Sequence, residues 1–231
     1  MAIATKTRRH KDKMESTGRR AVFVDRDGVV NGMHFNADFG LIDSPANPDQ
    51  FELLPGVGKA ISSLNEIGLA VVVVSNQPGI AKGKFTPALL RAMEDKMVSS
   101  IAADGGKVDA IYNCLHHPEG VVDEYSVRCD CRKPEPGLFL KAAAELSIDL
   151  SHSYTVGDGV TDIAAGKAAG TTALFVGSRK CYNCDALIEH QTWPDYVVSD
   201  LVEAAAVIRS LEAGDREYAN QFRLKCAPAS F

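Results

Sequence analysis

The stretch LAVVVVSNQPG, residues 69–79, begins as an unbroken apolar run and ends in polar and turn-forming residues. An apolar run rich in β-branched residues is typical of a strand covered on both faces, as the strands of parallel sheets are. The chain's first apolar segment, AVFVDRDG at 21–28, repeats this order of an apolar run followed by polar residues. Together the two stretches predict a parallel β-sheet.

Four further short apolar runs extend the pattern, at DAIYN (109–113), SYTVG (153–157), TALFVG (172–177) and DYVV (195–198). Segments with helical character separate most of them, at 55–68, 86–103, 136–147, 160–170 and, as the last helix, 200–213. We expect Pro55 in the first turn of the first helix and Gly68 at its end, and Thr86 as the cap of the second with Pro87 at its first position. This alternation predicts one doubly wound α/β domain over residues 21–213.

The two ends of the chain differ from this domain in composition. Residues 1–20 carry seven Lys and Arg against two acidic residues, whereas the whole chain has a net charge of −5. Because no aromatic residues interleave with these charges, we expect a disordered, solvated tail rather than an arm that binds nucleic acid. Residues 214–231 form a C-terminal extension whose sequence indicates no role.

The chain as a whole reads as a globular protein of the cytoplasm. Hydrophobic residues make up 45% of it, and no apolar run is long enough to span a membrane. The N-terminus lacks the apolar region of a secretory signal. We therefore expect reduced thiols, no membrane partner and a monomer.

Ligands of doubly wound sheets bind at the carboxyl ends of the strands. Polar residues follow each predicted strand there: Asp25 and Asp27 after the first, Ser75, Asn76 and Gln77 after the second, Arg132 and Lys133 beyond the third, and Asp158 and Asp162 after the fourth. Each motif alone is common in turns and helix caps. Four of them, in order on successive strands, predict one site.

The residue types of this site indicate phosphoryl chemistry. Carboxylates that converge repel one another unless a cation lies between them, and oxygen ligands suit Mg²⁺. Ser75, Asn76 and Lys133 offer a hydroxyl, an amide and an ammonium group to the oxygens of a phosphoryl group. Asp25 would be the nucleophile that forms an aspartyl-phosphate, and Asp27 the general acid and base.

A second cluster is predicted between the third strand and Lys133. Cys114-x-His116 and Cys129-x-Cys131 provide three thiolates and an imidazole, a complete tetrahedral shell for structural zinc. A redox pair or free thiols are the alternatives, which a reducing compartment disfavours. Zinc would fix the loop that carries the next two residues, both cations. Cys181 and Cys184 have the spacing of a metal or redox pair, but no second pair follows them.

Taken in order, the segments VFVDRDGVVN, VVVVSNQPGIAKGKFT, CDCRKPEPG and TVGDGVTDIAAG resemble the motifs of the haloacid dehalogenase (HAD) superfamily of aspartate-nucleophile phosphohydrolases. More narrowly, residues 21–200 are similar to the D-glycero-D-manno-heptose 1,7-bisphosphate phosphatases and the related histidinol-phosphate phosphatases. The resemblance implies a magnesium-dependent phosphatase that acts on a small phosphorylated sugar. Histidinol phosphate or another small phosphomonoester is the alternative substrate.

The resemblance also implies roles for individual residues. Mg²⁺ would be held by Asp25, by the backbone carbonyl of Asp27 and by Asp158. The phosphoryl group would be held by Ser75 and Lys133, within the motif that also contains Asn76 and Gln77. The substrate would face Arg132 and the loop 32–36, which includes His34. The C-x-H pattern of the family selects His116 over His117 as the zinc ligand. A dead phosphatase scaffold or a D-x-D glycosyltransferase would not require this intact set of residues.

About forty residues separate the first two strands, too few for a separate cap domain. We therefore expect only the loops 32–50 and 78–85 and the zinc loop to cover the site. The family pattern has a lysine where this chain has Gly159, which removes one cation. Arg132, Lys82 and Lys84 are the residues that can replace its charge.

Overall fold

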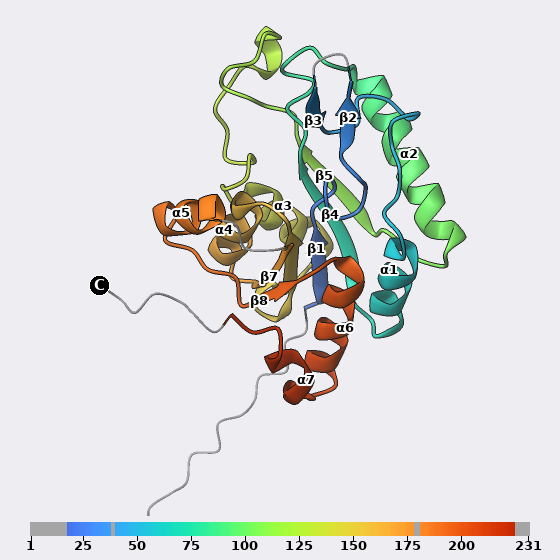
Figure 1. Cartoon of the computed structure of the whole chain (residues 1–231), viewed down its shortest axis with the longest axis vertical. Coiled ribbons are helices and arrows are strands. Elements are labelled where there is room, and N and C mark those ends of the chain that lie inside the picture. The colour runs from blue at the N-terminus through green and yellow to red at the C-terminus, as the bar shows by residue number, and fades with distance from the viewer. Residues whose placement is uncertain (1–17, 38–39, 178–180, 225–231) are drawn as a thin grey trace, which may run out of the picture.

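The computed structural model describes residues 18–37, 40–177 and 181–224 (Figure 1). Its centre is a six-stranded, fully parallel sheet in the order β5-β4-β1-β6-β7-β8. The strands are β1 Ala21–Val24, β4 Ala70–Asn76, β5 Ala110–Cys114, β6 Tyr154–Gly157, β7 Thr172–Val176 and β8 Tyr196–Val198. All six correspond to apolar runs of the sequence, so the predicted parallel sheet is confirmed.

Helices cover both faces of the sheet, as expected for a doubly wound domain (Figure 1). On one face lie α1 Val57–Glu66, α2 Pro87–Ala103 and α6 Leu201–Glu212, and on the other α3 Gly137–Leu146 and α4 Val160–Ala169. Alternate residues of β1 serve the two cores. Val22 and Val24 pack with the first group of helices, and Ala21 and Phe23 pack with α3.

The helix ends mostly follow the predicted capping residues. The Thr86 side chain accepts a hydrogen bond from the backbone N–H of Leu89, and Pro87 is the first residue of α2. The expected place of Pro55 is wrong, because α1 begins only at Val57. Gly56 precedes the helix with a φ of 76°, a left-handed conformation that keeps Pro55 in a turn outside it.

One hairpin and two helices of the described chain were not predicted. The segment expected as a loop at 32–50 contains an antiparallel hairpin of β2 His34–Asn36 and β3 Leu41–Asp43. Helix α5 spans Cys181–Glu189, and α7 spans Arg216–Asn220. The expectation that 200–213 forms the last helix is therefore wrong. Asp215 caps α7 by accepting hydrogen bonds from two backbone N–H groups, and Ala219 is buried against the core.

The described chain starts inside the basic segment. Arg19 and Arg20 form ion pairs with Asp109 and Glu212, so these residues belong to the folded domain. The rest of the predicted tail, residues 1–17, lies outside the described residues, as do the side chains of Cys181 and Cys184. None of the described helices has both the length and the apolar character that a membrane span requires.

Candidate active site

The polar residues at the carboxyl ends of β1, β4 and β6 meet at one edge of the sheet, as the sequence predicts. The strand order places β1 between β4 and β6, and the backbone N–H of Asp25 bonds to the Val156 carbonyl at 2.9 Å. Carboxylate oxygens of Asp25, Asp158 and Asp162 lie within 4.8 Å of one another. The edge therefore gathers three carboxylates in one small volume.

Lys133 is the cation at the centre of this group. Its ammonium group donates to an Asp25 oxygen at 2.6 Å and to the Val74 carbonyl at 2.8 Å, and it pairs with Asp162 at 2.5 Å. Burial disfavours its charge, but the charges of Asp162 and Asp25 outweigh burial and place the pKa of Lys133 above its usual range. The side chain is only 2% exposed, so Lys133 is a fixed positive charge beside Asp25.

Asn76 positions this lysine. Its amide nitrogen donates to the Lys133 carbonyl and its amide oxygen accepts from the Lys133 N–H, both at 3.0 Å. Both polar atoms of the side chain thus contact the backbone of a residue far away in the sequence. This is a positioning contact, and it differs from the phosphoryl contact that we expected for Asn76.

Four hydrogen bonds hold the carboxylate of Asp27. Arg26 donates from Nε at 3.0 Å and from Nη2 at 3.1 Å, Asn31 donates at 3.0 Å, and the Gln77 amide donates at 2.8 Å. The same Gln77 nitrogen also donates to the Ser75 hydroxyl at 2.9 Å. Gln77 therefore connects two residues that the sequence assigned to the site.

Arg26 and Asn31 are site residues that were not predicted from the sequence pattern. Along an extended strand the side chains of Arg26 and Asp27 would point to opposite faces. The strand ends before them, and a tight turn follows in which the N–H groups of Val30 and Asn31 both bond to the Arg26 carbonyl. This turn brings both side chains onto Asp27.

The carboxylates carry more negative charge than Lys133 balances. Burial, with the Asp162 charge adding to it and Lys133 opposing it, raises the pKa of Asp25 to about 7. Burial and the Asp162 charge raise the pKa of Asp158 to about 6. A divalent cation would relieve this repulsion, so the donor set fits Mg²⁺.

Asp25 and Asp158 are the better candidates to bind such a cation. Both oxygens of Asp162 already have partners, Lys133 for one and the backbone N–H of Gly159, at 2.9 Å, for the other. Gly28 makes room for Asp158, since a Cβ at this position would lie 2.2 Å from an Asp158 oxygen. Its φ of 89° also favours glycine.

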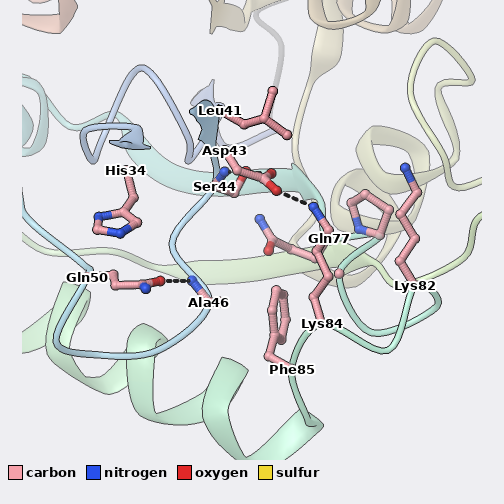
Figure 2. A pocket seen from close by; sticks show the side chains of 12 residues that line it. His34, Leu41, Asp43, Ser44, Ala46, Gln50, Gln77, Lys82, Lys84 and Phe85 are labelled. Carbon is pink, nitrogen blue, oxygen red and sulfur yellow. Dashed lines mark hydrogen bonds and ion pairs between the residues drawn. The ribbon is translucent and has the colours of Figure 1, made fainter. Parts of the chain in front are cut away.

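A cavity of about 430 Å³ adjoins this site, between the β2–β3 hairpin and the loop 78–85 (Figure 2). Its lining is His34, Leu41, Asp43, Ser44, Ala46, Gln50, Gln77, Pro78, Gly79, Lys82, Lys84 and Phe85. Lys84 forms an ion pair with Asp43 across the cavity wall, whereas Lys82 has no hydrogen-bond or ion-pair partner among the described residues. Lys82 is therefore a free positive charge beside the cavity.

His34 and Arg132, both predicted to face the substrate, lie in different pockets. His34 lines the cavity described above, and Arg132 lines a second, more open pocket of about 340 Å³ beside Lys133. Arg132 also donates to the His116 carbonyl at 3.4 Å, which ties it to the Cys/His loop. The structure thus brings the two residues to separate sides of the site.

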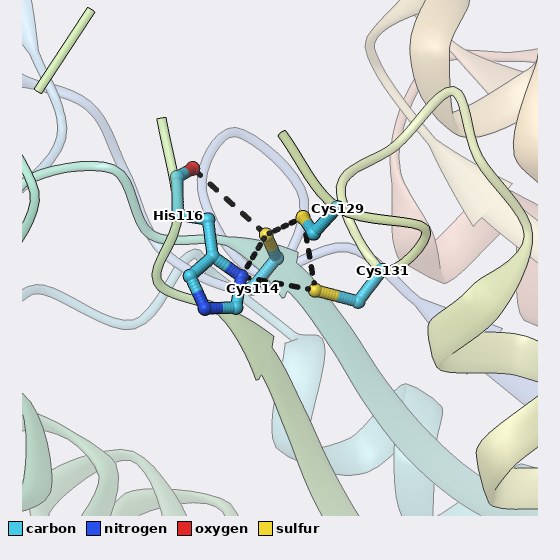
Figure 3. A group of neighbouring side chains, drawn as sticks. All are labelled: Cys114, His116, Cys129 and Cys131. Carbon is cyan, nitrogen blue, oxygen red and sulfur yellow. Dashed lines mark hydrogen bonds between the residues drawn. The ribbon is translucent and has the colours of Figure 1, made fainter. Parts of the chain in front are cut away.

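The predicted zinc ligands lie together (Figure 3). The Sγ atom of Cys129 is 3.6 Å from that of Cys114 and 3.2 Å from that of Cys131, and His116 Nδ1 is 3.4 Å from Cys131 Sγ. Ligands of a tetrahedral zinc at a Zn–S distance of about 2.3 Å are roughly 3.8 Å apart, so the cluster has a suitable size. His117 lies outside it, its ring accepting a hydrogen bond from the Glu119 N–H.

The thiols of Cys114, Cys129 and Cys131 lie as close together as the ligands of one metal ion would. Burial, followed by the neighbouring thiols, raises the pKa of Cys131, and burial raises that of Cys114. Thiolates this close need a positive charge among them, which zinc supplies. Cys114 also pairs with Asn76 in the sheet, so the cluster adjoins the residue that positions Lys133.

Comparison with known proteins decides the family. A family model described as HAD-hydrolase-like matches residues 130–204. The D-glycero-beta-D-manno-heptose-1,7-bisphosphate 7-phosphatase of Escherichia coli O6:H1 is 40% identical over 190 residues, which are 82% of this chain and 94% of that protein. The chain belongs to the HAD-like hydrolase family. This HAD-like enzyme is a phosphatase, as the sequence predicts.

Solved structures of HAD-like phosphatases agree with this assignment. The D,D-heptose 1.7-bisphosphate phosphatase from B. bronchiseptica, crystallised with magnesium and phosphate, superposes with a TM-score of 0.67 at 33% identity, over 83% of this chain and 99% of that one. A HAD-like phosphatase from Mesorhizobium loti gives a TM-score of 0.66 at 28% identity, over 90% of each chain. In the chain described here, the residues between β1 and β4 that the structure describes contain only the β2–β3 hairpin and α1.

Proposed function

We propose that this HAD-like phosphatase hydrolyses D-glycero-D-manno-heptose 1,7-bisphosphate through an aspartyl-phosphate on Asp25. The observation that carries the mechanism is the arrangement around Asp25, with the buried Lys133 at 2.6 Å and the firmly held Asp27 two residues away. The substrate of the relative from E. coli supports the choice of sugar.

In the first step, an Asp25 oxygen bonds to phosphorus while the bond from phosphorus to the sugar oxygen breaks and Asp27 protonates that oxygen. In the second step, Asp27 removes a proton from a water molecule, which attacks the aspartyl-phosphate. Inorganic phosphate leaves and the Asp25 carboxylate is restored. The hydroxyl of Ser75 and the ammonium group of Lys133 hold the phosphoryl oxygens throughout.

Two metals have roles in this proposal. Asp25, the Asp27 carbonyl and Asp158 would hold Mg²⁺, which supplies positive charge beside the phosphoryl oxygens. Cys114, His116, Cys129 and Cys131 would hold a structural zinc, because their complete ligand set leaves no position open for water. The zinc would keep Arg132 and Lys133 in place.

The cavity beside Gln77 would receive the rest of the sugar phosphate. Its lining groups, among them His34, Ser44 and Gln50, suit the hydroxyl groups of a polyol. Its free charge, Lys82, is positive and suits a second phosphate. Among the described residues that line the cavity, the acid is Asp43, and it is already paired with Lys84. This disfavours histidinol phosphate, because that substrate carries an ammonium group.

The test is a comparison of kcat/KM for heptose 1,7-bisphosphate, fructose 1,6-bisphosphate and histidinol phosphate, with the purified full chain in Mg²⁺. We expect the highest value for the heptose bisphosphate and a single released phosphate per molecule, located by phosphorus NMR of the product. A higher kcat/KM for histidinol phosphate would refute the assigned substrate while leaving the phosphatase chemistry intact.

A further inference from the structure

We propose that Arg26 is a positioning residue that orients the carboxylate of Asp27 for protonation of the leaving oxygen. Its Nε and Nη2 atoms donate to the two oxygens of Asp27, at 3.0 and 3.1 Å. Such a paired contact between a planar guanidinium and a carboxylate fixes the plane of the carboxylate as well as its position. The inference rests on the acid role proposed above for Asp27.

The burial of Arg26 indicates that its role is to orient the Asp27 carboxylate. Its side chain is 1% exposed, and Asp27 is its ion-pair partner. Its third guanidinium nitrogen, Nη1, has no hydrogen-bond partner among the described residues. A buried ion pair with unsatisfied donors is weak support for stability, since apolar replacements of such pairs are often neutral or stabilising. A fixed orientation of Asp27 is what this pair provides.

The four hydrogen bonds on Asp27 also indicate which oxygen reacts. Oδ1 accepts from Arg26 Nε and from Asn31, which is itself fully buried in the turn. Oδ2 accepts from Arg26 Nη2 and from Gln77, a residue that lines the substrate cavity. Among the described residues, only Arg26 contacts both oxygens, and its Nη2 lies 2.9 Å from Oδ1 and 3.1 Å from Oδ2. Asn31 fixes Oδ1 within the turn, so Oδ2, which also contacts Gln77, is the oxygen on the substrate side.

The test compares Arg26→Lys and Arg26→Gln with the wild type on two substrates. A sugar bisphosphate has an alkoxide leaving group that needs a proton, whereas p-nitrophenyl phosphate releases a phenolate that does not. We expect kcat/KM to fall about 10- to 100-fold for the sugar bisphosphate and less than about threefold for p-nitrophenyl phosphate. A merely structural role would lower both values equally, and that result would overturn the proposal.

Two controls separate this inference from the proposed function. Arg91→Lys, on the exposed side of α2, should leave both values unchanged. Asp27→Asn should show the same dependence on the leaving group; if it does not, the acid role of Asp27 fails. If Asp27→Asn shows the dependence and neither Arg26 variant does, Arg26 is not a positioning residue. Melting curves accompany each variant, and loss of the fold in both would make Arg26 a structural residue and would also overturn the proposal.

Discussion

At the scale of single residues, the proposed mechanism depends on one buried carboxylate, that of Asp25, which would react as an anion. Burial raises the pKa of Asp25 to about 7, and the Lys133 charge opposes this rise. The Lys133 ammonium group, 2.6 Å from an Asp25 oxygen, favours the ionised carboxylate, and in the proposed mechanism it would also contact the phosphoryl oxygens. Removing the negative charge of Asp25 and removing the positive charge of Lys133 should therefore affect the reaction in different ways.

The first prediction concerns the two aspartates. Asp25→Asn should lower turnover by more than about a thousandfold without loss of the fold, because an amide is nearly the same size but is not nucleophilic. Asp27→Asn should still become phosphorylated by p-nitrophenyl phosphate and then release phosphate slowly. Phosphate release, circular dichroism and mass spectrometry of acid-quenched protein measure these effects. Wild-type turnover in Asp25→Asn, purified free of wild-type enzyme, would contradict the mechanism.

At the scale of elements, the loop from β5 to α3 and the β2–β3 hairpin border the site from two sides. The first is closed by the Cys/His cluster, and the second is joined to the loop 78–85 by the ion pair of Asp43 and Lys84. Neither element belongs to the central sheet. Substitutions at Cys129 or in the hairpin therefore lie outside the central sheet, whereas Cys114 is the last residue of β5.

The second prediction concerns the zinc cluster. Freshly purified, reduced protein should contain about one zinc per chain. Cys129→Ser should lose it and should lower both the melting temperature and the activity, because metal binding contributes free energy of folding. His117→Ala is the matched control, since its ring lies outside the cluster, and it should retain the metal. Elemental analysis measures the zinc content of each protein. Wild-type protein without zinc would refute the proposed zinc site.

The third prediction concerns the two lysines of the loop 78–85. Lys82→Met should lower kcat/KM for the bisphosphate by about 10- to 100-fold, the value of one charge-assisted contact, and should change that for a sugar monophosphate little. Lys84→Met removes a lysine already paired with Asp43, so its effect on the bisphosphate should be smaller. Equal losses on both substrates in Lys82→Met would show that this residue does not contact the second phosphate.

At the scale of the whole molecule, hydrogen bonds far from the site join the N-terminal segment to the edge of the sheet. One Asp109 oxygen accepts from the Val71 N–H at 2.9 Å, and the other accepts from Arg19 and Lys107, both at 2.8 Å. Burial raises the pKa of Asp109, but the bonds from Lys107, Val71 and Arg19 outweigh it and hold this pKa below the usual 3.8. A carboxylate with a lowered pKa stabilises the fold above its unfolded pKa.

The fourth prediction follows from the lowered pKa of Asp109. Asp109→Asn should lower the free energy of unfolding by about 1–3 kcal/mol at pH 7, the worth of charged hydrogen bonds. The difference from wild type should persist at pH 5 and should shrink as the pH falls through 3.8 towards the lower pKa of the folded state. Urea unfolding followed by circular dichroism at several pH values measures it. A difference that grows on acidification would contradict the assigned pKa direction.

The sequence predicted the features that depend on local pattern. The six strands follow from apolar runs, and the start of α2 follows from Thr86 and Pro87, because burial and capping act over a few residues. Strand β2 of the hairpin has three residues and α7 has five. Such elements are too short to show a periodic pattern of apolar residues. The contacts of Arg26 with Asp27 and of Asn76 with Lys133 depend on a turn and on a partner distant in sequence. These contacts can therefore be identified only from the folded structure.

With zinc bound as we propose, the Cys/His cluster would make the segment 117–128 replaceable. Its entrance is fixed by Cys114 and His116 and its exit by Cys129 and Cys131, so its length does not set the position of the residues that follow. Within the described chain this segment contacts the rest of the protein through two hydrogen bonds to the Ala81 carbonyl and through Tyr125, which packs against the core. Loop closure depends only weakly on length, so longer or foreign sequences can be inserted there at small cost. An engineer could thus reshape the rim of this enzyme by replacing one surface segment while retaining Tyr125 and the four proposed zinc ligands.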